Sequence, residues 1–126
     1  MSAEPTAADR SLKPDCLFCR IVRGEVPSRK AAEDDLVLAF HDINPRSPTH
    51  ILVIPKIHIG SAADLVEDDG PLLGRMFSTL AAIARDTGIA DNGYRIVSNV
   101  GEWAGQSVDH LHLHLMGGRA FDWPPG

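Results

Sequence analysis

Two short runs of apolar and β-branched residues give the clearest secondary-structure signal in the chain. Residues 35–42, DLVLAFHD, and 49–56, THILVIPK, are nearly continuous in such side chains, and the turn-forming cluster NPRSP, 44–48, lies between them. Runs of this length bounded by turn residues are typical of buried strands. The pattern therefore predicts two strands joined by a tight connection.

A longer segment, from Pro71 to Gly88, has the periodicity of an amphipathic helix. The acidic residues before the proline favour a helix start, and the glycine favours a helix end. The apolar side chains recur at i, i+3, i+4 and i+7. They are Leu72, Leu73, Met76, Phe77, Leu80, Ile83 and Ala84. A shorter helix is predicted within CLFCRIVRGEVP, 16–27, where Gly24 is the expected stop.

The remaining elements complete a mixed fold. Residues 94–100, YRIVSNV, and 108–116, VDHLHLHLM, predict two more strands, separated by the glycine-containing loop GEWAGQS, 101–107. Residues 30–34 can add an edge strand. Several strands with only one long helix favour an α+β domain, an antiparallel sheet with the helices packed on one face.

Length and charge limit the class of protein. The chain has 126 residues, 44% of them hydrophobic, which predicts one domain with a packed core. Its net charge is -5 and its lysines and arginines are scattered, which argues against binding of long nucleic acid. No apolar run approaches the roughly 20 residues of a membrane helix.

The N-terminal residues, 1–15, are polar and lack the apolar core of a signal peptide. We expect them to form a disordered tail, and residues 16–126 to form the domain. The chain has only two cysteines, so no disulfide framework is expected and a reducing, cytoplasmic location fits.

Three histidines alternate with leucines in the stretch HLHLHL, 110–115. Alternate residues of a strand point to the same face, so His110, His112 and His114 are expected on one face and the leucines on the other. Neutral imidazole is a good nucleophile with a pKa of about 6.5. A three-histidine zinc site, or a polar strand face that carries histidine by chance, would also fit this pattern.

The loop before the histidines favours chemistry at phosphorus. Gly105 allows backbone N–H groups to approach an anion closely, and Gln106 and Ser107 follow it directly. The hydroxyl of Ser107 can donate to an oxyanion or to a departing group. Such donors suit the charge that builds on phosphorus-bound oxygens during nucleophilic attack.

These residues carry a resemblance to a known family. The stretch AGQSVDHLHLHLMGGR, 104–119, with WPPG, 123–126, resembles the histidine triad (HIT) superfamily and, within it, the HINT branch of nucleotide-binding phosphoramidases. The stretch LAFHDINPRSPTHILVIPKIH, 38–58, is similar to the same branch. The resemblance extends from about Cys16 to Gly126. It implies a five-stranded antiparallel sheet with two main helices, paired into a homodimer whose C-terminal segments reach towards the partner's site.

The resemblance also implies an activity, hydrolysis of the P–N bond of nucleoside 5'-phosphoramidates through a nucleotidyl-histidine intermediate, releasing AMP or GMP and an amine. By the match, His112 is the nucleophile, His114 contacts the phosphate, and Ser107 hydrogen-bonds near the leaving nitrogen. No catalytic metal or organic cofactor is expected. The other matched residues line the nucleotide site: Asn99, Gly105 and Gln106 at the phosphate, Asp42 at the ribose hydroxyls, Phe18, Phe40 and Ile43 at the base, and His50 beside the triad.

Other interpretations remain open at this point. The same fold can serve a dinucleoside polyphosphate hydrolase or a nucleotidyl transferase, and the protein could instead bind nucleotides or partners with incidental catalysis. Phe18 and Phe40 could be ordinary core residues. Asp42 and Asn99 could be turn residues. His41 has no matched role and is interpreted as structural.

The pair Cys16-x-x-Cys19 is a weak metal signal alone, because a redox pair or two buried thiols would also fit. Many bacterial HIT proteins bind structural zinc through such a pair, a histidine after the I-P-K segment and the first triad histidine. The resemblance therefore implies a zinc site of Cys16, Cys19, His58 and His110, in which His110 is structural and not catalytic. Animal HINT proteins lack this cysteine pair, so the chain combines HINT-like active-site sequence with a bacterial ligand set.

Overall fold

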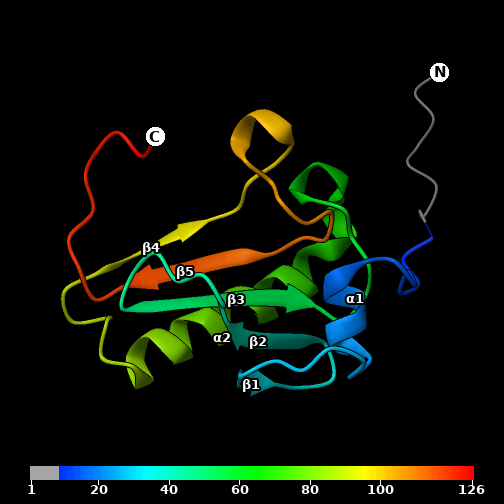
Figure 1. Ribbon diagram of the computed structural model, residues 1–126, viewed down its shortest axis with the longest axis horizontal. Helices are drawn as coiled ribbons and strands as arrows, with labels where there is room; N and C mark the ends of the chain where they lie inside the picture. The colour runs from blue at the N-terminus through cyan, green and yellow to red at the C-terminus, as the bar shows by residue number, and fades with distance from the viewer. Residues whose placement is uncertain (1–8) are drawn as a thin grey trace.

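The fold is an antiparallel sheet between two helices of very different length (Figure 1). The structure, a computed structural model, describes residues 9–126. The helices and strands, in chain order, are α1 (Leu17–Val22), β1 (Lys30–Glu33), β2 (Val37–His41), β3 (Thr49–Pro55), α2 (Gly70–Asp86), β4 (Tyr94–Val97) and β5 (Leu113–Gly117). The strands form one sheet in the order β1-β2-β3-β5-β4, and every neighbouring pair is antiparallel. The α+β class and the five-stranded sheet are thereby confirmed. Of the two main helices expected, α2 has 17 residues and α1 only six.

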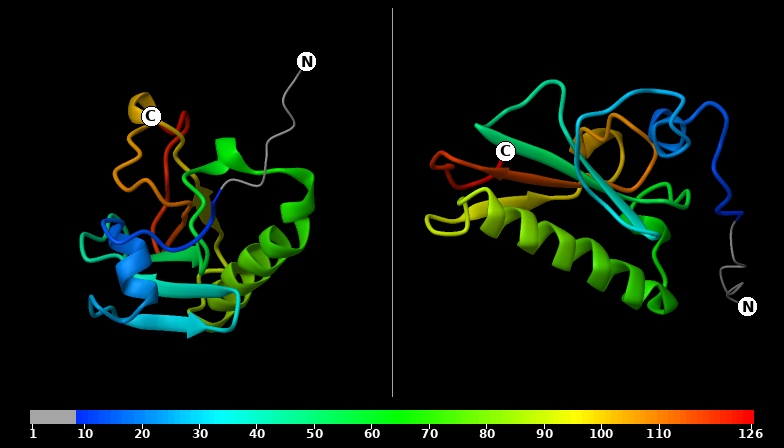
Figure 2. Two further views of the ribbon diagram at one scale, coloured as in Figure 1. Left: turned by 90° about the vertical axis from the view of Figure 1, so that its right-hand side faces the viewer. Right: turned by 90° about the horizontal axis from the view of Figure 1, so that it is seen from below.

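The helices lie on opposite faces of the sheet, and the expectation of one shared face is wrong (Figure 2). The α2 face is packed with Val37, Ala39, Ile51, Val53, Met76, Leu80, Leu113 and Leu115. The α1 face is packed with Phe18, Ile21, Leu38, Phe40, Leu52 and Ile54. Neighbouring residues of β2 and β3 therefore enter different cores, which explains why these strands are apolar without alternation.

Helix α2 follows its predicted stripe closely. The buried members are Met76, Leu80, Ile83 and Ala84, whereas Phe77 is 45% exposed and lies at the margin. The helix begins one residue before Pro71 and ends at Asp86, and Gly88 follows with a φ of 83°. This left-handed conformation favours glycine after a helix end.

The histidine-bearing strand is shorter than predicted. Strand β5 begins at Leu113, not near Val108, so only His114 of the triad lies within it. Val97, the last residue of β4, pairs with His114, so the residues before His114 have no partner on that side. On the other side, the register of β3 would place Pro55 opposite Leu111, and proline has no backbone N–H to donate. The backbone N–H of Leu111 donates instead to the carbonyl of Ile59, at 2.6 Å. The leucines of this stretch are nevertheless all buried in the α2 core.

The predicted N-terminal tail is only partly within the described residues, since 1–8 lie outside them. Residues 9–15 contact the domain. The guanidinium of Arg10 donates to the carboxylate of Asp69, at 2.9 Å for Nη2, and the Arg10 carbonyl accepts from the backbone N–H of His58, at 2.8 Å. This segment therefore passes directly beside His58. No helix in the described part of the chain, 9–126, is long and apolar enough to cross a membrane.

Candidate functional site

A cavity of about 440 Å³ between α1 and the sheet gathers seven of the predicted site residues. They are Phe18, Phe40, Asp42, Ile43, Ser107, His112 and His114. Its volume lies within the range of about 300–1,000 Å³ that small-molecule sites occupy. Its lining combines aromatic and aliphatic side chains from α1, β2 and β3 with the Asp42 carboxylate, the Ser107 hydroxyl and the imidazoles of His112 and His114, among other polar groups. The cavity thus brings apolar side chains and several polar groups together.

Three residues expected at the phosphate do not line this cavity. The side chain of Gln106 is used within the loop: its Nε2 donates to the carbonyls of Gly60 and Val108, at 2.8 and 3.0 Å, and its Oε1 accepts from the backbone N–H of Gly101. The backbone N–H of Gly105 donates to the backbone carbonyl of Glu102. Its φ of 82° is left-handed, which explains why glycine stands at this position. Asn99 is half-buried just beyond β4, away from the cavity lining.

His112 lines the cavity with its ring proton position fixed. Its Nδ1 is 2.7 Å from the backbone carbonyl of His110. A carbonyl oxygen can only accept, so Nδ1 donates, and Nε2 of the neutral ring keeps its lone pair. The side chain is 4% exposed, and the ring of Phe18 meets it edge-on with centroids 5.1 Å apart. In its neutral form His112 therefore offers Nε2 as a nucleophile.

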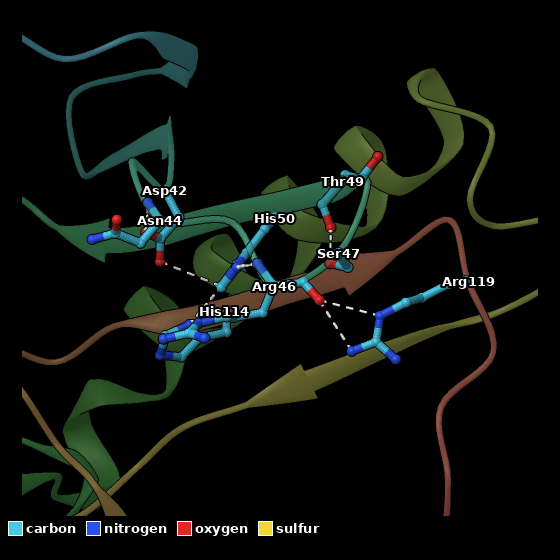
Figure 3. Close-up of polar contacts among 8 residues, drawn as sticks. All are labelled: Asp42, Asn44, Arg46, Ser47, Thr49, His50, His114 and Arg119. Atoms are coloured by element: carbon cyan, nitrogen blue, oxygen red, sulfur yellow. Dashed lines mark hydrogen bonds and ion pairs between the residues drawn. The ribbon is translucent and has the colours of Figure 1, made fainter.

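His50, the histidine predicted beside the triad, lies next to His114 (Figure 3) and does not line the cavity. The backbone N–H of Arg46 donates to Nδ1 of His50, at 3.0 Å, so the proton of the neutral ring is on Nε2. This Nε2 is 2.9 Å from Nδ1 of His114 and 3.4 Å from the carboxylate of Asp42. His50 thus donates to His114, and neutral His114 carries its own proton on Nε2. That N–H is a donor for an anion in the cavity.

Burial keeps this histidine pair neutral near pH 7. Burial, followed by the proximity of His112 and His50, lowers the pKa of His114 to about 4. Burial also lowers the pKa of His50, although the carboxylate of Asp42 opposes this shift. Neutral rings are what the hydrogen bonds above require, because a doubly protonated His50 could not accept from Arg46.

Several cavity residues were not identified from the sequence. They include Ser28, Arg29, His41 and Asn44, together with apolar neighbours of Phe18 on α1. His41 was interpreted as structural, but it lines the cavity at the end of β2, where burial lowers its pKa. Ser28 and Arg29 precede β1 in a segment without a motif, so only the folded chain reveals their position. Asn44 could have been found as the polar neighbour of Asp42 in the turn.

The four predicted metal ligands also come together. One donor atom each from Cys16, Cys19, His58 and His110 lies within 4.8 Å of all the others. Neither thiol is in a disulfide. Burial raises the pKa of Cys19 to about 11, so this thiol is protonated when no cation is near. A cation bound here would displace that proton.

The distances in this cluster fit a tetrahedral zinc site. Zn–S bonds of about 2.3 Å and Zn–N bonds of about 2.0–2.1 Å place neighbouring ligand atoms roughly 3.3–3.8 Å apart. Nδ1 of His110 is 3.4 Å from Sγ of Cys16 and 3.5 Å from Sγ of Cys19, and Nδ1 of His58 is 3.3 Å from Sγ of Cys19. Nε2 of His110 donates to the carbonyl of Pro55, at 3.0 Å, so Nδ1 presents its lone pair to the thiols. The residues present therefore suit zinc.

A second cluster, Asp42, His50 and His114, also meets the distance criterion for a cation site. Its nitrogen atoms are only 2.9 Å apart, closer than two ligands of one tetrahedral ion. Nδ1 of His50 is in addition occupied by the N–H of Arg46. A hydrogen-bonded pair explains this geometry better than a metal site.

Comparison with known proteins gives consistent matches. The HIT domain family matches residues 23–121. The purine nucleoside phosphoramidase of Escherichia coli strain K12 is 47% identical over 105 residues, which cover 83% of this chain and 88% of that protein. An uncharacterized HIT-like protein of Synechococcus elongatus is 46% identical over 115 residues, 91% of this chain and all of that protein. The crystal structure of a HIT family hydrolase from Legionella pneumophila superposes with a TM-score of 0.87 at 47% identity, covering 89% of this chain and all of that chain.

Proposed function

The chain belongs to the HIT family, and on that premise we propose that it hydrolyses the P–N bond of nucleoside 5'-phosphoramidates, releasing AMP or GMP and an amine. The observation that carries the proposal is the hydrogen bond from Nδ1 of His112 to the carbonyl of His110, which leaves Nε2 as a nucleophile in the cavity. The similarity to a purine nucleoside phosphoramidase over most of both chains supports this substrate class.

The cavity suits a nucleotide with its base and phosphate at different walls. We assign the base to the apolar wall formed by Phe18, Phe40 and Ile43. We assign the ribose hydroxyls to the carboxylate of Asp42, which already accepts from the N–H of Asn44 and has further lone pairs free to accept. The phosphate then lies towards His112 and His114.

In the first step, Nε2 of His112 attacks phosphorus and forms a new P–N bond. The bond from phosphorus to the substrate nitrogen breaks, and that nitrogen leaves with the electron pair and gains a proton. We assign delivery of this proton to the hydroxyl of Ser107, which lines the same cavity. The Nε2–H of His114 stabilises the charge on the phosphorus-bound oxygens.

In the second step, water attacks phosphorus and the bond to His112 breaks. The nucleotide leaves as AMP or GMP, the attacking water gives one proton to Ser107 and so restores its hydroxyl, and His112 regains its lone pair. Dividing the reaction in this way replaces one difficult displacement with two easier ones. The ring can serve twice because the carbonyl of His110 fixes its Nδ1 proton throughout.

We propose that Cys16, Cys19, His58 and His110 hold a structural zinc ion. Bound zinc would cross-link α1 to the segments that follow β3 and precede β5. Phe18 lies between the two cysteines, so the cross-link would hold this wall of the nucleotide site in place. Thiols kept for a metal are also consistent with a reducing, cytoplasmic location.

We further propose a homodimer. Among residues 9–126, strand β4 pairs with β5 on one side only, so in this part of the chain its other edge is open to a second strand. Apolar side chains are exposed nearby, among them Ile96 at 38% and Val100 at 42%. Sedimentation velocity tests this assignment: Ile96→Lys should sediment as a monomer at concentrations where the native protein is dimeric, and a native monomer would contradict it.

Purified protein mixed with adenosine 5'-phosphoramidate, without added metal, tests the activity by release of AMP. The native protein should release AMP, and a folded His112→Ala variant should release essentially none while still binding AMP. A folded, AMP-binding native protein that releases no AMP would refute the proposal. In that case, assays with dinucleoside polyphosphates would separate a polyphosphate hydrolase from a binding protein.

A further inference from the structure

We propose that Arg119, which follows β5 and lies outside the cavity, is a positioning residue for the histidine pair His50 and His114. It acts through the loop 42–48 that connects β2 to β3. The catalytic part of this inference rests on the proposed phosphoramidase function. Its structural part concerns the proton position on His50 and stands independently of any activity.

Arg119 is attached to this loop by a forked hydrogen bond (Figure 3). Its Nε and Nη2 both donate to the carbonyl of Arg46, at 3.1 and 3.0 Å. Its Nη1 donates to the carbonyl of Ala120, at 3.1 Å, and its guanidinium carbon lies 4.2 Å from the centroid of the Phe121 ring. The planar guanidinium is thus fixed along both edges and on one face, which makes it a well-ordered donor.

Arg46 links Arg119 to the histidine pair through its backbone. Its carbonyl accepts from Arg119, and its own backbone N–H donates to Nδ1 of His50, at 3.0 Å. The two groups belong to one residue, so holding the carbonyl limits how far the N–H can turn. The exposed Arg46 side chain contributes no part of this link. The chain of contacts therefore runs from Arg119 through Arg46 and His50 to His114.

A second contact fixes the same loop against the same segment. Gly118 has a φ of 92°, and a Cβ at this position would lie 2.8 Å from Cβ of Pro48. The backbone at Gly118 therefore packs directly on the loop, and only glycine permits this approach. Ser47, between the two contacts, is buried and its hydroxyl donates to the carbonyl of Thr49. The turn after β5 is thus docked on the loop at two points.

The loss of the Arg46 N–H would change the chemistry of the cavity. Without that donor, neutral His50 is free to carry its proton on Nδ1, which leaves a lone pair on Nε2 facing His114. Two lone pairs at 2.9 Å repel, so Nδ1 of His114 would take a proton and its Nε2 would lose one. The nitrogen that should donate to the phosphate would then present a lone pair to an anion. Arg119 thus selects the catalytically useful proton arrangement from outside the site.

The test compares Arg119→Ala and Arg119→Lys with the matched control Arg95→Ala. Arg95 also lies over the ring of Phe121, at 5.1 Å, and donates to the carbonyl of Asp122, but it makes no contact with Arg46. Two quantities are measured on each folded variant: kcat and KM with adenosine 5'-phosphoramidate, and the ¹⁵N chemical shifts of the ring nitrogens of His50. The shifts report directly which ring nitrogen of His50 carries the proton. If Arg119 had a purely structural role, its replacement would leave these shifts unchanged.

Arg119→Ala should lower kcat by roughly 10- to 100-fold with a small change in KM, because a displaced catalytic donor costs about this much. Its His50 nitrogens should shift towards a protonated Nδ1. Arg119→Lys, whose compact ammonium lacks the planar fork of the guanidinium, should fall between it and the native protein. Arg95→Ala should keep kcat and KM within about twofold of native and leave the His50 shifts unchanged. Unchanged His50 shifts in Arg119→Ala would overturn the inference, as would a native kcat alongside changed shifts. If the native protein has no phosphoramidase activity, the proposed function fails, and the shifts alone decide whether Arg119 sets the proton position.

Discussion

Replacing Phe18 separates two roles that this residue combines. Phe18 is 4% exposed and packs in the α1 core, where its ring lies edge-on to Phe40 with centroids 5.5 Å apart. It also lines the nucleotide cavity and meets the ring of His112 at 5.1 Å. We therefore expect a substitution here to change both the free energy of unfolding and the binding of substrate.

The expected magnitudes follow from these contacts. Truncating a buried phenylalanine to alanine costs about 3–5 kcal/mol, roughly a fifth or more of the stability of a typical domain. Phe18→Leu keeps most of the volume and should cost less than about 1.5 kcal/mol. It removes the aromatic edge, worth about 0.5–1.5 kcal/mol per pair, so KM should rise by roughly 2- to 10-fold if the wall contacts the base.

The assay pairs urea unfolding with steady-state kinetics on adenosine 5'-phosphoramidate. Ile83→Val is the matched control, because Ile83 is buried in the α2 core on the opposite face and the change costs a similar 0.5–1.5 kcal/mol. Phe18→Leu should raise KM and Ile83→Val should not. Equal losses of stability with a native KM in both variants would refute the assignment of Phe18 to the nucleotide wall.

Three further predictions concern the ribose, the metal and pH. Asp42→Asn should raise KM by about 10-fold with little change in kcat, because a charged acceptor for the hydroxyls is lost; an equal penalty on a 2'-deoxy substrate would contradict this role. Mass spectrometry of metals should find about one zinc ion per native chain and none in Cys19→Ser, and the Tm of this variant should be roughly 10 °C below that of the native protein. A native protein that contains no metal and has the same Tm as Cys19→Ser would contradict the site. The pKa of His114 is lowered to about 4 in the folded chain, so the unfolded chain binds the extra proton, and stability should fall as pH drops from about 6.5 to 4. Between pH 6.5 and 4, the free energy of unfolding of His114→Asn should fall by about 1–2 kcal/mol less than that of the native protein, allowing for the partial exposure of the side chain. Identical pH profiles of unfolding for the two proteins would count against the burial argument.

The strongest elements of the fold could be predicted because local pattern and tertiary burial agree. The apolar runs that became β2 and β3, and the stripe of α2, are each buried as their periodicity implies. The placement of α1 could not be predicted, since a six-residue helix carries too little pattern to identify the face it covers. The late start of the histidine strand depends on where β4 stops, which is a property of the whole sheet.

The candidate site divides in a similar way. The cavity residues on the histidine motif were predicted because three alternating histidines are rare. The four residues that cluster as candidate metal ligands were predicted only through the family resemblance, because a Cys-x-x-Cys pair alone is a weak signal. Gln106 was expected at the phosphate, but its amide bonds to three backbone groups that meet only in the folded loop. The link from Arg119 to His50 runs through a backbone carbonyl and a backbone N–H. Every residue except proline has both groups, so no sequence pattern reports their use.

The central claim is that Nε2 of His112 forms a covalent bond to phosphorus. The most direct measurement is intact-protein mass spectrometry of the native protein mixed with adenosine 5'-phosphoramidate and quenched in denaturant within one turnover, followed by peptide mapping. The account predicts an adenylyl group on the peptide that contains His112, and neither adduct nor AMP release in a folded His112→Ala variant. An adduct on another residue, or AMP release by His112→Ala at the native rate, would contradict it.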